Sequence, residues 1–406
     1  MSSYPMTMRL VDLDDALRIH DLSDPATGPH AVQLVVDALE AALSAAWPSD
    51  VRRVSGRRVV SLADNYDNLG YEPDAVTRDA RHTRYVEPDR VLRSHSSAII
   101  PSALRALARD AAAGTAPDDV LLSCPGICYR RDSVDWQHTG TPHQIDLWRL
   151  VSLDRASTGD GHGVAPTVCT AAGLVAMIGL VVDAVLPGRE WRAVPAVHPY
   201  TARGCQIDVL MADTWVEIGE CGLAAAHVIE RAGLDATRWS GLAMGLGLDR
   251  LVMLRKGIPD IRLLRSADPR VAVQMQDLAP YRPVSHMPPV RRDLSSVVGR
   301  TADVSDEAVG DRVRMALGTD ADAVESAEVV AVTAYEDLTD SARQRLGLRP
   351  GQSNALIRLV LRALDRSLTD LEANRMRDRV YAALHEGERH EWALVSGGSK
   401  PGSARR

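Results

Sequence analysis

Apolar residues recur at helical spacing in three stretches of the first two hundred residues. Between residues 30 and 47 they fall three or four positions apart, which predicts a helix that ends before a proline. Residues 101–113 predict a second helix, and residues 167–186 predict a third that is alanine-rich and apolar on most sides. Residues 1–29 are polar and turn-rich, so they predict an extension ahead of these elements.

Runs rich in β-branched and other apolar residues predict strands between and after these helices. Residues 120–129 and 144–152 predict two adjacent strands joined by a polar loop, and residues 205–210 and 214–218 predict another pair. Residues 241–255 open with glycines and then take helical spacing. Helices and strands mixed in this way predict an α+β fold.

A proline-rich stretch at residues 279–289 divides the chain, whose 406 residues are too many for one compact core. Beyond it the pattern predicts a βαββαβ order with a weak final strand. The two helices of this order are expected at 305–316 and 369–385, and two of its strands at 329–335 and 355–361. We therefore expect an N-terminal extension (1–29), two domains (30–278 and 281–395) and a flexible tail (396–406).

Composition narrows the class of protein. Apolar residues make up 45% and charged residues 25%, which is typical of a globular protein that is not membrane-embedded, and no apolar run is long enough to span a bilayer. The net charge of −7 argues against a generally basic coat for nucleic acid. The start lacks the pattern of an export signal, and the five cysteines are an odd number, so we expect a cytoplasmic protein with reduced thiols.

The chain contains no phenylalanine, and all but two of its 47 basic residues are arginine. A GC-rich genome would deplete lysine and phenylalanine together. Alternatively, the chain must be made when phenylalanine codons are read unreliably. Both explanations stay open, and counting phenylalanine in neighbouring genes would decide between them.

Polar residues suited to chemistry gather in three segments, at 92–97, 128–146 and 240–262. The second and third each hold an arginine, Arg130 and Arg250, at the end of a predicted strand or the start of a predicted helix. Arginines placed in this way suit bidentate binding of phosphate, and glycines let a flat ligand approach the backbone. Together the segments predict a nucleotide triphosphate site that lacks a P-loop.

The motifs Cys-Tyr-Arg-Arg-Asp at 128–132 and Gly-Leu-Ala-Met-Gly-Leu-Gly-Leu-Asp-Arg at 241–250 resemble motifs 2 and 3 of class II aminoacyl-tRNA synthetases, specifically of the phenylalanyl-tRNA synthetase catalytic chain. The resemblance covers residues 30–278 and implies a six-stranded antiparallel sheet flanked by helices. Residues 281–395, with Pro-Val-Arg-Arg-Asp-Leu-Ser at 289–295 as a signature near their start, resemble the ferredoxin-like, split βαβ anticodon-binding domain of the single-chain organellar enzyme.

This resemblance implies that ATP and Mg²⁺ take part. It implies that Arg130 binds the α-phosphate and Arg250 the γ-phosphate while a substrate carboxylate attacks the α-phosphorus in line. The remaining expected nucleotide-binding residues are Asp132, His138, Glu217 and Gly247, with Glu217 also the expected Mg²⁺ ligand.

The resemblance also implies an amino-acid site. Its polar end would be formed by His95, Ser97, Gln144 and Asp146, and its side-chain end by His198, Tyr200, Glu220, Gly222 and Ala243. Asp146 stands where the family has glutamate. His198 and Tyr200 stand where the family has two phenylalanines, and Glu220 replaces a glycine.

A carboxylate among apolar groups needs a partner, which for Glu220 would be His198, Arg203 or the substrate; a pairing with Arg203 outside the site is the alternative. We therefore predict that the preferred amino acid is not plain phenylalanine but a hydroxylated or amino-bearing aromatic one.

Three functions fit these features. The first is an aminoacyl-tRNA synthetase that charges a tRNA, expected to be the phenylalanine tRNA. The second is a paralogue that activates an amino acid for a biosynthetic amide bond or a carrier protein, and the third is a non-catalytic tRNA-binding protein. Motif 1 is faint, somewhere in 48–72, and leaves a monomer and a homodimer both open.

Overall fold

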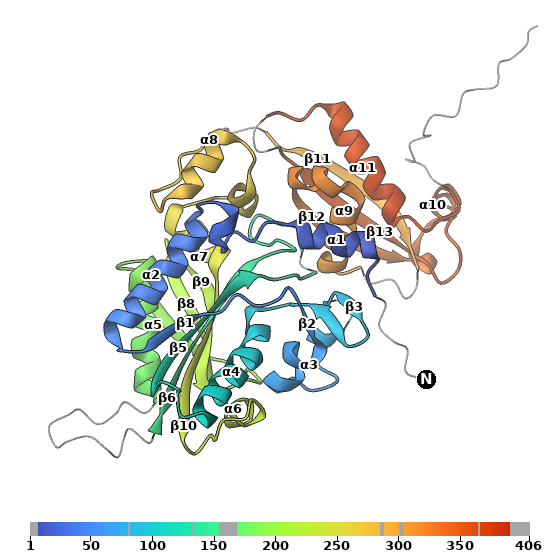
Figure 1. Ribbon diagram of the computed structural model, residues 1–406. Helices are drawn as coiled ribbons and strands as arrows, with labels where there is room; N and C mark the ends of the chain where they lie inside the picture. Colours follow the sequence, from blue (N-terminus) through green and yellow to red (C-terminus); the bar gives the residue numbers. More distant parts are fainter. Residues whose placement is uncertain are drawn as a thin grey trace, which may run out of the picture. The chain divides into compact units, whose positions relative to one another are not determined.

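The structure is a computed structural model that describes residues 7–79, 82–131, 133–153, 169–284, 288–299, 304–363 and 366–389. The described chain forms two compact units (Figure 1). The first takes the residues up to Arg130 and from Thr141 to Arg282, and the second takes Arg131–Gly140 and the residues from Pro283 on. No helix among the described residues is long and apolar enough to cross a membrane.

A seven-stranded sheet forms the centre of the first unit, in the order β1-β5-β6-β10-β9-β8-β7. Its strands are β1 (Asp50–Arg53), β5 (Asp119–Ile127), β6 (His143–Ser152), β7 (Trp191–Pro195), β8 (Thr201–Met211), β9 (Thr214–Ala224) and β10 (Trp239–Gly247). All neighbours are antiparallel except β1, which pairs with β5 in parallel. The expected α+β fold with a flanked antiparallel sheet is confirmed. The six antiparallel strands are β5 to β10, and β1 adds a seventh, parallel strand that was not expected. Strand β1 is four residues long and rich in charge, so it carries little apolar pattern of its own.

Helices cover both faces of this sheet (Figure 1). On one side lie α2 (Ala31–Ala46), α5 (Ala171–Val185) and α7 (Leu248–Lys256), and on the other lie α4 (Ile100–Ala112) and α6 (Ala226–Arg231). Apolar residues of α4 and α6 join Trp148 of β6 and Ala243 of β10 in one buried cluster. The predicted helices at 30–47 and 101–113 are therefore present, because their apolar stripes are buried against the sheet.

Smaller elements complete the first unit. They are α1 (Leu10–Arg18), α3 (Leu62–Asn65), α8 (Pro269–Ala272) and a sheet of β2 (Val59–Ser61), β4 (Arg90–Leu92) and β3 (Tyr85–Glu87). Helix α1 falls inside the segment that was expected to be an extension without elements. Leu10, Val11 and Leu17 are exposed, and only Ala16 and the partly buried Leu13 pack against apolar residues of the unit, so the buried side of this helix is narrow. It is held instead by contacts with the rest of the unit, such as the bond from Tyr129 Oη to the Ala16 carbonyl oxygen.

The second unit has a three-stranded antiparallel sheet in the order β11-β13-β12. Along the chain its elements are β11 (Val290–Val298), α9 (Asp306–Leu317), β12 (Val324–Ala334), α10 (Asp340–Leu346), β13 (Ser353–Leu361) and α11 (Asp370–Leu384). Apolar residues of α9, α11 and the three strands form its core. The expected weak final strand would follow α11, where residues 390–406 lie outside the described part. The ferredoxin-like assignment and the domain limits stay predictions.

Candidate active site

Three neighbouring strands, β6, β10 and β9, carry most of the predicted site residues on one face of the large sheet. Asp146 pairs with Gly245, and Gly245 pairs with Glu220. Paired residues of antiparallel strands point to the same side, so the two carboxylates flank a residue that has no side chain. A methyl group added to Gly245 would lie 3.8 Å from a carboxylate oxygen of Asp146. We call this surface of β6, β10 and β9 the site face.

The middle of the site face is built from small residues. Ala243 is fully buried and pairs with Trp148 on one side and Gly222 on the other. A side chain at Gly222 would come within 2.6 Å of the Thr201 side chain, so only glycine fits there. Gly247 pairs with Gln144, and each lies two positions from a member of the Gly245–Asp146 pair, so both are on the site face. The strand register therefore brings together six of the predicted residues: Gln144, Asp146, Glu220, Gly222, Ala243 and Gly247.

Asp146 is buried and fully occupied by hydrogen bonds. The Ser96 hydroxyl donates to Oδ2 over 2.5 Å and the Ser97 hydroxyl over 3.1 Å, while Trp148 Nε1 donates to Oδ1 over 3.1 Å. Burial nevertheless raises the pKa of Asp146 from 3.8 to about 6. Of these donors only Ser97 was predicted. Ser96 could have been suspected only because it is next to Ser97, and Trp148 only because it lies two positions after Asp146.

This buried carboxyl group predicts a pH effect on stability. Because Asp146 binds its proton more tightly in the folded state, the free energy of unfolding should fall as the pH rises from about 4 to about 6. Asparagine does not titrate, so we expect the wild type to lose about 2–3 kcal/mol relative to Asp146→Asn between pH 4 and pH 7. Urea unfolding of both proteins at several pH values measures this. A stability difference that does not change with pH would contradict it.

Glu220 makes its contacts at the other end of the site face. Its Oε2 accepts a hydrogen bond from the Tyr200 hydroxyl over 3.1 Å, and His198 Nε2 lies 3.2 Å from the same oxygen. Burial would raise the pKa of Glu220, but the bonds from His198 and Tyr200 outweigh it, so the pKa is lowered and the group is ionised. Of the partners considered from the sequence, His198 is therefore the one present, rather than Arg203.

Aromatic rings stand beside this carboxylate. The rings of His198 and Tyr200 stack with centroids 5.9 Å apart, and Tyr71 lies 6.4 Å from Tyr200 and stacks on His95 at 5.7 Å. Burial, together with the charge of Arg130, lowers the pKa of His95 to about 3, so its imidazole is neutral. Tyr71 was missed from the sequence, because it lies in an irregular segment at the end of the range where only a faint motif 1 was recognised.

The two predicted phosphate-binding arginines lie at different edges of this group of residues. Arg130 follows β5, and its Nε donates to the Ser94 carbonyl oxygen over 2.8 Å. Arg250 lies in the first turn of α7, and its Nη1 donates to the Glu217 carbonyl oxygen over 3.2 Å. Burial raises the pKa of Glu217, the nearby Glu220 raises it further, and Arg250 opposes the shift. Glu220 lies close enough to Arg130 to feel its charge, and Glu217 feels the charges of both Glu220 and Arg250.

Two predicted nucleotide-binding residues are not among these. Asp132 lies outside the described residues. His138 belongs to the second unit, where its Nδ1 lies 2.6 Å from an oxygen of Asp135. In the same segment, Val134 bridges to Ala327 of β12.

Glu217 is the one predicted metal ligand. It pairs across strands with Asp208, whose carboxylate is bound by Arg192 over 2.8 Å. The described residues contain no cluster of three or more side chains able to hold a metal. Mg²⁺ in nucleotide sites is commonly held by one or two carboxylates together with substrate phosphates. Glu217 keeps an accessible side chain close to Arg250 and would fit a Mg²⁺ ion bound together with ATP.

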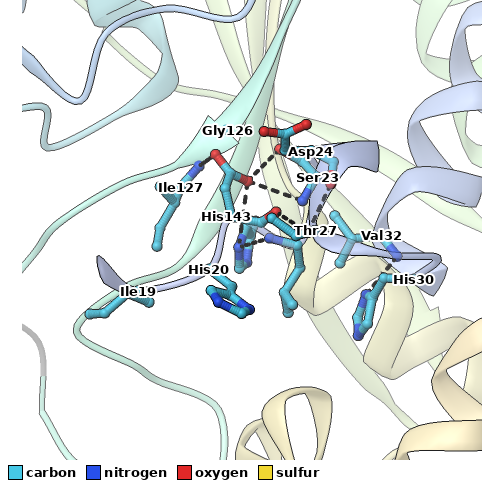
Figure 2. Close-up of polar contacts among 12 residues, drawn as sticks. Ile19, His20, Ser23, Asp24, Thr27, His30, Val32, Gly126, Ile127 and His143 are labelled. Carbon is cyan, nitrogen blue, oxygen red and sulfur yellow. Dashed lines mark hydrogen bonds and ion pairs between the residues drawn. The ribbon is translucent and has the colours of Figure 1, made fainter. Parts of the chain in front are cut away.

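A buried histidine behind the site was also missed. Figure 2 shows His143 at the start of β6 beside the segment around Ser23 and Thr27. Its Nε2 accepts hydrogen bonds from the Leu22 backbone N–H and from Arg265 Nη2, each over 3.0 Å. The proton is therefore on Nδ1, which donates to Asp249 over 2.8 Å. Since Asp249 precedes Arg250, this pair fixes the end of motif 3, in the first turn of α7, against the strand that carries Gln144 and Asp146.

The first unit also matches a known family. The model described as tRNA synthetases class II core domain (F) matches residues 23–275, well over half of the chain. The chain belongs to the class II tRNA synthetases. As a member of this family it is a ligase, and the fold and motifs inferred from the sequence agree with this. Neither a carrier-protein ligase nor a non-catalytic protein is favoured.

Relatives of this synthetase include enzymes from organelles and bacteria. It is 26% identical to a probable mitochondrial phenylalanine–tRNA ligase of Drosophila melanogaster, over 80% of this chain and 75% of the relative. It is 27% identical to the chloroplastic/mitochondrial phenylalanine–tRNA ligase of Arabidopsis thaliana, over 79% of this chain and 68% of that one. A Prochlorococcus marinus phenylalanine–tRNA ligase alpha subunit is 34% identical over 55% of this chain and 59% of the subunit.

Proposed function

We propose that this synthetase uses ATP to activate an amino acid as its aminoacyl-adenylate and then transfers the aminoacyl group to a tRNA, as a phenylalanine–tRNA ligase does. The observation that carries the proposal is the site face. Asp146, bound by Ser96 and Ser97, lies at one end of it, and Glu220, bound by His198 and Tyr200, lies at the other. Arg130 and Arg250 lie at its edges. The names of the two organellar relatives support the same reaction.

In the first step, the carboxylate of the amino acid attacks the α-phosphorus of ATP, and pyrophosphate leaves. Arg130 would stabilise the charge that develops on the α-phosphate, and Arg250 would hold the departing phosphates. When bound with ATP, Mg²⁺ would neutralise phosphate charge. No protein nucleophile is needed, because orientation and fixed positive charge lower the barrier.

The substrate's polar end would lie against His95, Ser97, Gln144 and Asp146. The neutral imidazole of His95 can donate a hydrogen bond without adding a second positive charge beside the ammonium group. In the second step, a terminal hydroxyl of tRNA attacks the carbonyl carbon of the adenylate, and AMP leaves. The tRNA would be the phenylalanine tRNA, and the second unit of the protein would bind its anticodon.

The cytoplasmic location stays a prediction, since the organelles in the names belong to the relatives. The oligomeric state, monomer or homodimer, is equally a matter for measurement.

The test is amino-acid-dependent ATP–pyrophosphate exchange with a panel of natural and substituted aromatic amino acids. We expect exchange with at least one aromatic member and transfer of the activated amino acid to tRNA. Reactions without amino acid, and reactions with a carrier protein in place of tRNA, are the controls. Exchange followed by transfer only to the carrier protein would contradict the proposal, and so would no exchange with any amino acid.

A further inference from the structure

The carboxylate of Glu220 has one oxygen bound and one oxygen open. The Tyr200 hydroxyl and His198 Nε2 both reach Oε2. Within the described residues, Oε1 has no hydrogen-bond partner, and 41% of the Glu220 side chain is accessible to solvent. The two bonds on Oε2 fix the orientation of the group and leave Oε1 available to a ligand.

Asp146, at the other end of the site face, has no open oxygen of this kind. Asp146 is 1% exposed, and its two oxygens already accept hydrogen bonds from Ser96, Ser97 and Trp148. Between the two carboxylates stands Gly245, which leaves the surface bare. Of these two carboxylates, Glu220 is therefore the one that offers an open acceptor.

The surroundings of Glu220 suit a flat aromatic group. Tyr200 is 7% exposed and lies between the rings of His198, Tyr71 and Trp148, at centroid distances of 5.9, 6.4 and 6.4 Å. Aromatic rings pack well against such walls, and a positively charged or polarised N–H group gains further from their faces. An aromatic ligand without a donor would cover Oε1 and leave an ionised oxygen without water or a partner, which is costly.

We propose that Glu220 Oε1 accepts a hydrogen bond from a donor on the substrate's side chain, so that this synthetase selects an aromatic amino acid bearing an amino or hydroxyl group over phenylalanine. This inference rests on the proposed function, because it assigns the substrate of the same site. His198 and Tyr200 act as positioning residues that hold the carboxylate. Sites built to pair a polar group of the substrate reject the analogue that lacks it.

Direct binding tests the inference separately from catalysis. Calorimetric titration would compare 4-aminophenylalanine, tyrosine and phenylalanine with the wild type, Glu220→Gly and Glu220→Gln. We expect a donor-bearing amino acid to bind the wild type at least tenfold more tightly than phenylalanine. In Glu220→Gly this preference should fall below about threefold, because phenylalanine gains affinity and the donor-bearing ligand loses it. Glu220→Gln keeps an acceptor and should keep part of the preference. Asp213→Asn, an exposed carboxylate in the turn between β8 and β9, is the matched control and should change nothing.

Three results would overturn the inference. Phenylalanine could bind the wild type most tightly, the preference could survive in Glu220→Gly, or that variant could lose affinity for all three ligands equally. The last result would mean that Glu220 binds the α-ammonium group. Pyrophosphate exchange on the same samples separates the two proposals. Exchange that is best with phenylalanine keeps the proposed function and removes this inference, while selective binding without exchange does the reverse.

Discussion

Replacing Arg130 with alanine is expected to lower ATP–pyrophosphate exchange by about 100- to 1000-fold while the protein remains folded. Among the described residues, the Arg130 guanidinium is held by the bond from its Nε to the Ser94 carbonyl oxygen. Burial lowers the pKa of His95, and the bonds from His198 and Tyr200 outweigh burial and lower that of Glu220; the charge of Arg130 adds to both shifts, so Arg130 lies near the proposed amino-acid site. A fixed positive charge there favours the transition state, in which negative charge grows on the α-phosphate, more than the ground state.

Arg250→Ala should cause a loss of similar size, because it removes the charge that we propose faces the departing phosphates. The measurement is single-turnover adenylate formation alongside thermal unfolding, so that a loss of fold is recognised. Arg189→Ala, at an exposed position in the turn before β7, is the matched control and should keep full activity. Near-native exchange in either site variant would show that the assigned nucleotide site is wrong.

The second large effect concerns stability. His143→Leu is expected to destabilise the protein by about 2–4 kcal/mol, since the buried Asp249 carboxylate loses its imidazole donor and keeps only the bond from the backbone N–H of residue 143. Burial would raise the pKa of Asp249, but His143 outweighs it and lowers the pKa, so the carboxylate is charged at neutral pH. The same substitution removes the acceptor for the Leu22 backbone N–H and for Arg265.

Urea unfolding monitored by circular dichroism measures this loss. His143→Asn is the conservative comparison, because its side-chain amide can still donate toward Asp249, and it should cost clearly less. The double variant His143→Leu with Asp249→Leu should also cost less than the sum of the single losses, because the buried carboxylate is removed together with its donor. Additive losses would indicate that the two residues do not act as a pair.

Much of the first unit could be predicted from local pattern. The helix at 30–47 has an apolar stripe, and even its cap is local, since the His30 ring accepts from the Val32 N–H. Strands β5 and β6 are long and apolar, so their antiparallel pairing was also expected. Strand β1 could not be foreseen, because it is stabilised by parallel pairing with residues 120–123, which lie far along the chain.

The site divides in the same way. Motif spacing identified the residues of the site face, because strand register turns a spacing of two into a shared side. Motif spacing could not identify Tyr71, whose ring stacks on His95, or the donors that occupy Asp146. Nor could it choose between His198 and Arg203 as the partner of Glu220, since that depends on how β8 bends where its register with β9 shifts between Ala202 and Cys205.

The contacts of the N-terminal segment have a consequence for how the chain folds as it is made. Arg265 Nη1 donates to the carbonyl oxygen of His20, a contact that spans 245 residues, and His143 reaches Leu22 across 121. At about 5–20 residues per second, the ribosome supplies Arg265 roughly 12–50 s after His20. Residues 19–30 therefore leave the ribosome early and wait for their partners. The first unit can close only when most of its chain has emerged, which makes its beginning one of the last parts to be fixed.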